Sequence, residues 1–161
     1  VTLSFVSPSF PIPYIYLNLL LSMNYLSLKD IKNGEMYFDK VWEIAQKDEF
    51  YRPIGESFSI SRGLLLKKSL NIQSPEYKKI SSIAEEHNNH CRKILMTDSY
   101  EGIFANLSST EWSIAKLASK KWTNREIADY LGISVSGVKN YLSRIYQKLY
   151  ISNRNELKNQ L

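Results

Sequence analysis

Apolar residues recur every three or four positions through most of the chain, which is the spacing of one face of an α-helix. In the first part of the chain, this pattern predicts helices over residues 14–28, 35–47, 58–70 and 75–95. The run Lys32-Asn33-Gly34 predicts a turn between the first two helices. Ser74 followed by Pro75 marks the start of the last one. We therefore expect an all-α fold.

The first two predicted helices have the length of one helical hairpin from a repeat protein. Such a hairpin cannot bury its apolar faces alone and stacks against neighbouring units. Its second helix carries a run of apolar residues at Met36, Phe38, Val41, Trp42 and Ala45. The N-terminal region, residues 1–96, is therefore expected to be helical and repeat-like.

The last third of the chain predicts four short helices, and three of them begin with recognisable capping chemistry. A capping side chain precedes a glutamate by three residues in each of the pairs Ser108/Glu111, Thr123/Glu126 and Asn153/Glu156. In such a capping box, the two side chains satisfy two otherwise unpaired amide donors reciprocally. Together they predict a small helical domain over residues 107–161, which follows a linker at residues 97–106.

Two of these helices are joined by a very short connection, Leu131-Gly132-Ile133-Ser134. The second repeats apolar residues on one stripe, at Val138, Leu142, Ile145 and Leu149. Its other side is polar and cationic, with Ser136, Lys139, Asn140, Ser143 and Gln147, and with Arg144 and Lys148 alongside. Such a helix suits the DNA major groove, whose base edges are read by amide, hydroxyl and amino groups. The periodicity alone is equally consistent with a solvated surface.

The residues of this domain resemble the LuxR-type helix-turn-helix. The match runs without a gap through residues 107–111, 124–128, 131–134 and 138–149, and continues in Asn153-Arg-Asn-Glu-Leu157. The resemblance implies a four-helix domain whose third helix reads DNA and whose fourth supports dimerisation. Carried over by position, it implies base contacts by Lys139, Asn140 and Ser143, and phosphate contacts by Asn124, Arg125, Ser134 and Arg144.

Four positions depart from the family pattern. Lys121 and Tyr150 stand where the family usually has glycine, Gly137 where it has threonine, and Tyr141 where it has histidine. Glycine after a helix end commonly takes a left-handed conformation, in which a tyrosine costs on the order of 1 kcal/mol. Gly137 near the start of the third helix costs a few tenths to about 1 kcal/mol. We expect the fold to be intact, whereas full DNA affinity does not follow from the resemblance.

The segment from Trp42 to Glu56, with Ser74 to Ile80 further on, looks like the end of a helical-repeat region. Such a region precedes the DNA-binding domain in large ATP-dependent LuxR regulators of the maltose-regulator type. This chain has no G-x-x-x-x-G-K-[ST] loop, the motif that cradles nucleotide phosphates. The resemblance therefore implies the C-terminal piece of such a regulator, or a short stand-alone product, without its nucleotide-binding module. A response-regulator receiver is not expected, because alternating strands are missing.

The distribution of charge points to a polyanion as partner. The 161 residues carry a formal net charge of +5. From Leu107 onward there are nine Lys and Arg residues against four Asp and Glu residues, and the rest of the chain holds twelve of each. A neutral region joined to a basic one is typical of nucleic-acid binding. Apolar residues make up 43% and charged residues 23%, as in ordinary globular proteins.

Other kinds of site find little support. The lone Cys91 excludes an intrachain disulfide and makes the reducing cytoplasm the default location. Prolines interrupt the apolar N-terminus, which falls short of the ~20 residues that a membrane span needs. His87, His90 and Cys91 could share a helix face, but no second cluster completes a zinc site. No nucleophile with a base can be assembled, so neither an enzyme nor a cofactor is expected.

The sequence thus predicts a transcriptional regulator that binds double-stranded DNA sequence-specifically and as a homodimer. The spacing of Leu157 and Leu161 suggests the fourth helix as the dimer interface, unless these leucines close the domain's own core. The alternative function is a helical interaction module, in which the N-terminal helices bind a protein partner. A regulator fragment with weakened DNA binding is a variant of that alternative.

Overall fold

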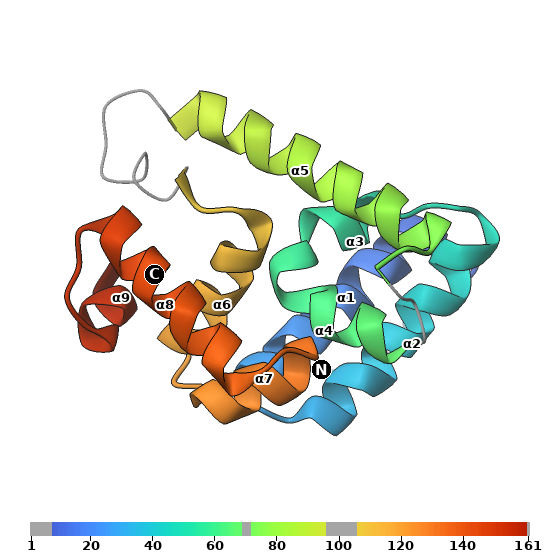
Figure 1. The fold of residues 1–161 in the computed structure, drawn as a ribbon. Coiled ribbons are helices and arrows are strands. Elements are labelled where there is room, and N and C mark those ends of the chain that lie inside the picture. Colours follow the sequence, from blue (N-terminus) through green and yellow to red (C-terminus); the bar gives the residue numbers. More distant parts are fainter. Residues whose placement is uncertain (1–7, 69–71, 96–105, 161) are drawn as a thin grey trace. The chain divides into compact units, whose positions relative to one another are not determined.

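The computed structural model describes residues 8–68, 72–95 and 106–160, and every regular element within these ranges is helical (Figure 1). This confirms the all-α prediction. Over the same ranges, none of the helices combines the length and the apolar character that a membrane crossing requires.

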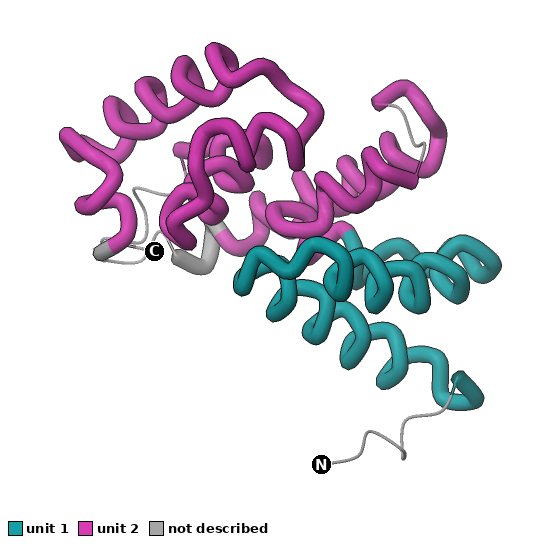
Figure 2. The backbone as a smooth tube through the Cα atoms, turned by 90° about the horizontal axis from the view of Figure 1, so that it is seen from below, with its two compact units in different colours: residues 1–54 teal, residues 55–161 magenta. Residues whose placement is uncertain are grey.

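By packing, the chain divides into two compact units, Val1–Ile54 and Gly55–Leu161 (Figure 2). The division lies well before the linker predicted at residues 97–106, most of which falls outside the described residues. The functional division at that linker therefore stays a prediction.

The first unit is a hairpin of α1 (Pro11–Ser27) and α2 (Ile31–Lys47), as the helical periodicity predicts. Its interior consists of side chains that are at most 4% exposed, namely Ile15, Leu19 and Leu26 from α1 and Phe38, Val41 and Ala45 from α2. Tyr25 and Tyr37 stack between the helices, with their ring centroids 5.4 Å apart. α1 begins earlier than predicted, because prolines are tolerated in a first turn whose N–H groups have no helical partner.

The predicted turn at Lys32-Asn33-Gly34 is wrong, since these residues lie inside α2. The turn comes earlier, and Asp30 caps α2 by accepting a hydrogen bond from the Asn33 amide at 3.1 Å. Gly34 is needed for close helix packing instead: a Cβ there would lie 2.9 Å from Cγ of Leu26. The Ser22 hydroxyl also donates to the Gly34 carbonyl at 2.7 Å.

α3 (Arg52–Glu56) includes the point at which the chain is divided, and the second unit continues with α4 (Phe58–Lys67) and α5 (Pro75–Leu95). α5 has the predicted bounds, and the Ser74 hydroxyl caps it by accepting from the Tyr77 amide at 3.2 Å. Phe58 and Tyr77 meet edge to face at 5.8 Å, which joins α4 to α5. α4 begins as predicted but is followed by a turn at Lys68 rather than running to residue 70.

The remaining helices are α6 (Ser109–Ser119), α7 (Asn124–Leu131), α8 (Val135–Leu149) and α9 (Arg154–Gln160), the four that the sequence predicts. Their shared core contains large side chains that are at most 2% exposed: Ile114, Leu117, Trp122, Ile127, Leu131, Val138, Ile145 and Leu157. Two predicted capping boxes are complete, at Ser108/Glu111 and Thr123/Glu126. At the third, the Glu156 carboxylate accepts a hydrogen bond from the Ser152 amide at 2.9 Å, and the backbone amide of Glu156 donates to Oδ1 of Asn153.

α4 packs directly against α6 and α7, a contact that the sequence did not predict. The Tyr130 hydroxyl of α7 donates to the Ile60 carbonyl of α4 at 2.5 Å. Gly63 leaves room for the same ring, because a Cβ there would lie 2.5 Å from it. Arg62 donates to the Thr110 hydroxyl of α6. The four C-terminal helices thus share their compact unit with α4.

Candidate nucleic-acid interface

Two capped ends set the geometry of α7 and α8. α7 ends at Gly132, whose φ of 64° and ψ of 36° are left-handed values that glycine adopts without a Cβ penalty. Ser134 then caps α8 by accepting a hydrogen bond from the Gly137 amide at 3.0 Å. Only residues 132–134 separate the two helices, so this connection fixes how α8 projects from the domain.

α8 has one buried and one exposed face, as predicted. The stripe of Val138, Leu142, Ile145 and Leu149 is at most 5% exposed. The polar residues of the other face are exposed: Ser136, Lys139, Asn140, Ser143, Arg144 and Gln147. Because α8 contains no Asp or Glu, that face presents positive charge to solvent.

The three residues predicted to contact bases lie together on this exposed face. Lys139 and Asn140 are adjacent, and Ser143 lies one turn further on. Residues three and four apart are neighbours on a helix surface, so the three side chains form one polar patch. Ammonium, amide and hydroxyl groups are the kinds that read base edges in a major groove.

The four residues predicted to contact phosphates have different surroundings. Arg125 and Arg144 are exposed. The Ser134 hydroxyl is engaged in capping α8 and lies 3.0 Å from the Ser136 hydroxyl. Asn124, the first residue of α7, joins Lys139 and Ser143 around an open cavity of about 280 Å³. The structure therefore brings one predicted phosphate contact beside two predicted base contacts.

Two further residues line this cavity that the sequence did not indicate as functional. Tyr146 and Arg154 complete its wall together with Leu142. The Arg154 guanidinium donates to the Ala118 carbonyl at 3.2 Å, to the Trp122 carbonyl and to Oδ1 of Asn124 at 3.0 Å. The motif Asn153-Arg-Asn-Glu-Leu157 was the available signal, but on its own it indicates only the start of a helix.

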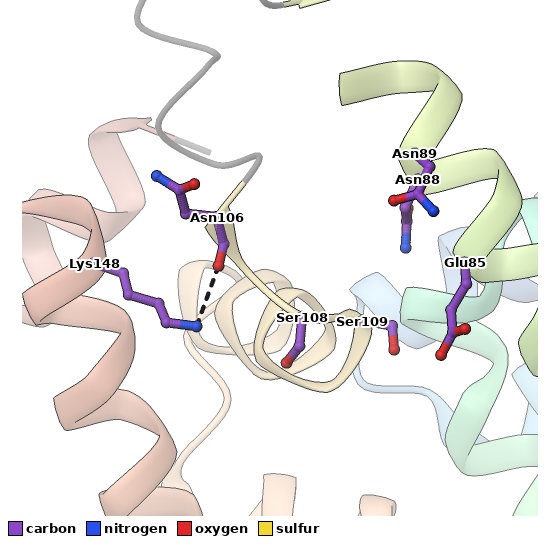
Figure 3. A pocket seen from close by; sticks show the side chains of 7 residues that line it. All are labelled: Glu85, Asn88, Asn89, Asn106, Ser108, Ser109 and Lys148. Carbon is purple, nitrogen blue, oxygen red and sulfur yellow. Dashed lines mark hydrogen bonds between the residues drawn. The ribbon is translucent and has the colours of Figure 1, made fainter. Parts of the chain in front are cut away.

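The Lys148 side chain is 40% exposed, as its spacing predicts, but its ammonium is paired with a carboxylate of α6. Its ammonium donates to Glu111 at 2.7 Å. It also donates to the Asn106 carbonyl at 3.2 Å, which Figure 3 marks with a dashed line. Burial, the largest single influence, acts to raise the pKa of Glu111, but hydrogen bonds from Lys148 and Ser108 outweigh it and lower that pKa. The buried carboxylate thus stays ionised and ties the end of α8 to the start of α6.

Lys148 also borders a polar cavity of about 400 Å³, beside Glu85, Asn88 and Asn89 of α5 (Figure 3). Elsewhere on α5, Sγ of Cys91 lies 3.5 Å from Nε2 of His87. Within the residues that the structure describes, no three His, Cys, Asp or Glu side chains gather closely enough to hold a metal ion.

The region that contains these helices is similar to known proteins. Residues 105–159 match the family described as bacterial regulatory proteins, luxR family. Over 55 residues the chain is 38% identical to the two-component response regulator PprB of Pseudomonas aeruginosa. That match covers 34% of this chain and 20% of PprB, so the chain spans only a small part of that relative. No solved structure gives a significant match.

Proposed function

We propose that this chain, whose residues 105–159 form a helix-turn-helix domain of the luxR family of bacterial regulatory proteins, regulates transcription by inserting α8 into the DNA major groove. The observation that carries the proposal is the acid-free, exposed face of α8, which stands opposite a fully buried stripe. The concentration of the net positive charge after Leu107 supports it. Such a regulator acts in the cytoplasm and needs no catalytic site.

Specificity, in this proposal, comes from Lys139, Asn140 and Ser143. A lysine reads the acceptors of guanine, an asparagine can pair with adenine through both of its amide atoms, and a serine hydroxyl suits several bases. Arg125 and Arg144, both exposed, supply phosphate contacts that position the helix without reading sequence. Asn124 and Ser134 are the other proposed phosphate contacts.

The test is duplex binding by the full chain on a site selected from random sequence. Lys139→Ala and Asn140→Ala should each weaken binding by about 1–3 kcal/mol and relax the preference at one base position. Lys78→Ala, which removes an exposed cation of α5, is the matched control and should leave the sequence preference unchanged. Unchanged affinity and preference in both α8 variants would show that this face does not read DNA.

The N-terminal helices are proposed to belong to a larger regulator of the maltose-regulator type. The α1–α2 hairpin has the form of a repeat unit, which supports this. In the same region α1 exposes apolar side chains four residues apart: Ile12, Tyr16 and Leu20 are 55%, 40% and 55% exposed. A protein partner that covers this row is the second candidate function. If that partner is a second copy of this chain, the native chain should associate in a concentration-dependent way in sedimentation, and Leu20→Glu should abolish that association. A native chain that does not associate would count against a second copy as the partner.

A further inference from the structure

The cavity between α7, α8 and the start of α9 has the chemistry of an anion site. Each of its polar lining residues carries at least one hydrogen-bond donor: Asn124, Lys139, Ser143, Tyr146 and Arg154. Two of these groups are cationic, and the lining residues include no carboxylate. The volume of about 280 Å³ is far above the roughly 30 Å³ that one water occupies in the liquid.

Arg154 dictates how Asn124 faces this cavity. A guanidinium carries only donors, so the group that it meets at 3.0 Å must be the amide oxygen of Asn124. The amide nitrogen of Asn124, with two donors, is thereby turned away from Arg154. The guanidinium itself is held by the Ala118 and Trp122 carbonyls at the end of α6, so it is a fixed support.

We propose that Arg154 is a positioning residue for DNA binding, which holds the Asn124 amide with its N–H groups directed into the cavity to bind one backbone phosphate. The inference rests on the proposed function and names the ligand of this cavity as a phosphodiester oxygen. Lys139 at the cavity wall adds positive charge while its side chain reaches toward base edges. Burial raises the pKa of Tyr146, so its phenol stays protonated at neutral pH and available as a donor.

Asn124→Asp separates this role from a structural one. An aspartate keeps an acceptor for Arg154, so the fold is supported as before, but it offers no donor and sets a negative charge toward the phosphate. We expect thermal stability to be retained while DNA affinity falls at least tenfold, the low end for a hydrogen bond to a charged group. Asn124→Ala should weaken binding roughly tenfold for the same reason.

The decisive experiment scans the phosphates of a duplex selected by the full chain, replacing each in turn with an uncharged methylphosphonate. The native chain, Asn124→Ala, Arg154→Lys and the double variant are compared. At one phosphate, the replacement should weaken binding by the native chain about tenfold. The same replacement should not weaken binding by either single variant any further. Arg154→Lys keeps the charge but loses the forked geometry, so it should reproduce Asn124→Ala, and the double variant should be no weaker.

Arg125→Ala is the matched control, because Arg125 neighbours Asn124 on α7 but does not line the cavity. The loss of DNA affinity in Arg125→Ala should add fully to the loss caused by replacing the phosphate assigned to Asn124. Native affinity in Asn124→Asp would overturn the inference. So would additive effects of Asn124→Ala and Arg154→Lys, or an Asn124→Ala effect that follows a base and no phosphate. If the native chain binds no duplex at any salt concentration, the proposed function itself fails and this inference falls with it.

Discussion

At the scale of single residues, the backbone is left-handed at two positions where the family resemblance led us to expect strain. Tyr150, directly after α8, has a φ of 55°, and Lys121, two residues after the end of α6, has a φ of 62°. The predicted conformation is therefore confirmed. The left-handed region brings Cβ close to the following carbonyl oxygen, and glycine escapes that penalty. The two residues remain left-handed despite this penalty, because two short connections require that backbone geometry.

Tyr150→Gly should stabilise the protein. The side chain is 88% exposed, so little packing is lost, while relief of the left-handed strain should raise the free energy of unfolding by about 1 kcal/mol. Urea denaturation followed by circular dichroism measures the change. Gly132→Ala, which introduces a Cβ at a φ of 64°, is the opposite control and should lower stability by a similar amount. A loss of stability in Tyr150→Gly would mean that the tyrosine ring contributes packing.

Glu111 gives a second prediction, in which pH matters. Its pKa is lowered in the folded state, so its contribution is complete above the unfolded pKa and is lost as pH falls through the folded value. Glu111→Gln should therefore lower stability at pH 7 by roughly 1–3 kcal/mol. The difference from the native chain should shrink as the pH falls below about 4.

The exposed pair Glu43–Lys47, 3.3 Å apart, is the control for Glu111. Both side chains are at least 70% exposed, so Glu43→Gln should change stability by no more than about 0.5 kcal/mol. Acid titrations of the free energy of unfolding in both variants make the comparison. Equal effects of the two substitutions would show that the buried carboxylate has no special role.

At the scale of elements, the most informative contact is that between α4 and the luxR-family domain. A helix is normally placed by its apolar face, and Leu64 and Leu65 are at most 1% exposed. The contact also requires Gly63, which lets the Tyr130 ring approach the α4 backbone. A glycine within a helical pattern normally indicates a less stable helix. Here Gly63 is the position at which α4 and α7 approach each other closely.

The substitution Gly63→Ala tests that contact by the sign of its effect. In a helix with an open face, alanine for glycine adds about 1 kcal/mol of stability. Here the new Cβ would lie 2.5 Å from the Tyr130 ring, so overpacking should lower stability by roughly 1–3 kcal/mol. Thermal denaturation of the full chain gives the sign, and a rise in stability would show that α4 is not held against α7. Tyr130→Phe removes the hydrogen bond to the Ile60 carbonyl, so it should lower the free energy of unfolding by about 1 kcal/mol.

For the whole molecule, the proposed homodimer concerns α9, whose leucines the sequence suggested as the interface. Leu157 is 0% exposed, so it closes the core of its own domain, which is the alternative that the sequence left open. Leu161 lies outside the described residues. Leu157 is buried because α9 is short and its apolar residue must close the core of the domain. Dimerisation on DNA therefore remains a proposal that does not use Leu157.

We expect productive binding to require two copies on a two-fold-related site. If one domain neutralises four or five phosphates, log affinity should fall against log salt with a slope of roughly −4, and two copies should double that slope. Half-sites should lie about one helical turn apart. Titration of a labelled duplex at several salt concentrations, with the mass of the complex, checks this. A tight one-to-one complex at physiological salt on a site without two-fold symmetry would contradict it.

Features that depend on residues within one or two helical turns of each other were predictable from the sequence. Helix starts at Ser74, Ser108 and Thr123 follow from side chains that reach three residues ahead. The buried stripe of α8 follows from helical spacing, which needs no knowledge of what covers it. The polar face of α8, and with it Lys139, Asn140 and Ser143, was predictable for the same reason.

Contacts between residues far apart in the chain became visible only in the folded structure. Ser22 meets Gly34 across 12 positions, Asn124 meets Arg154 across 30, Glu111 meets Lys148 across 37, and Ile60 meets Tyr130 across 70. Glycine is the same letter in a turn and at a helix crossing, and an arginine in a helix start shows no preference for a distant asparagine. Such pairs are selected by packing of the whole unit, because burial decides which polar groups must find partners.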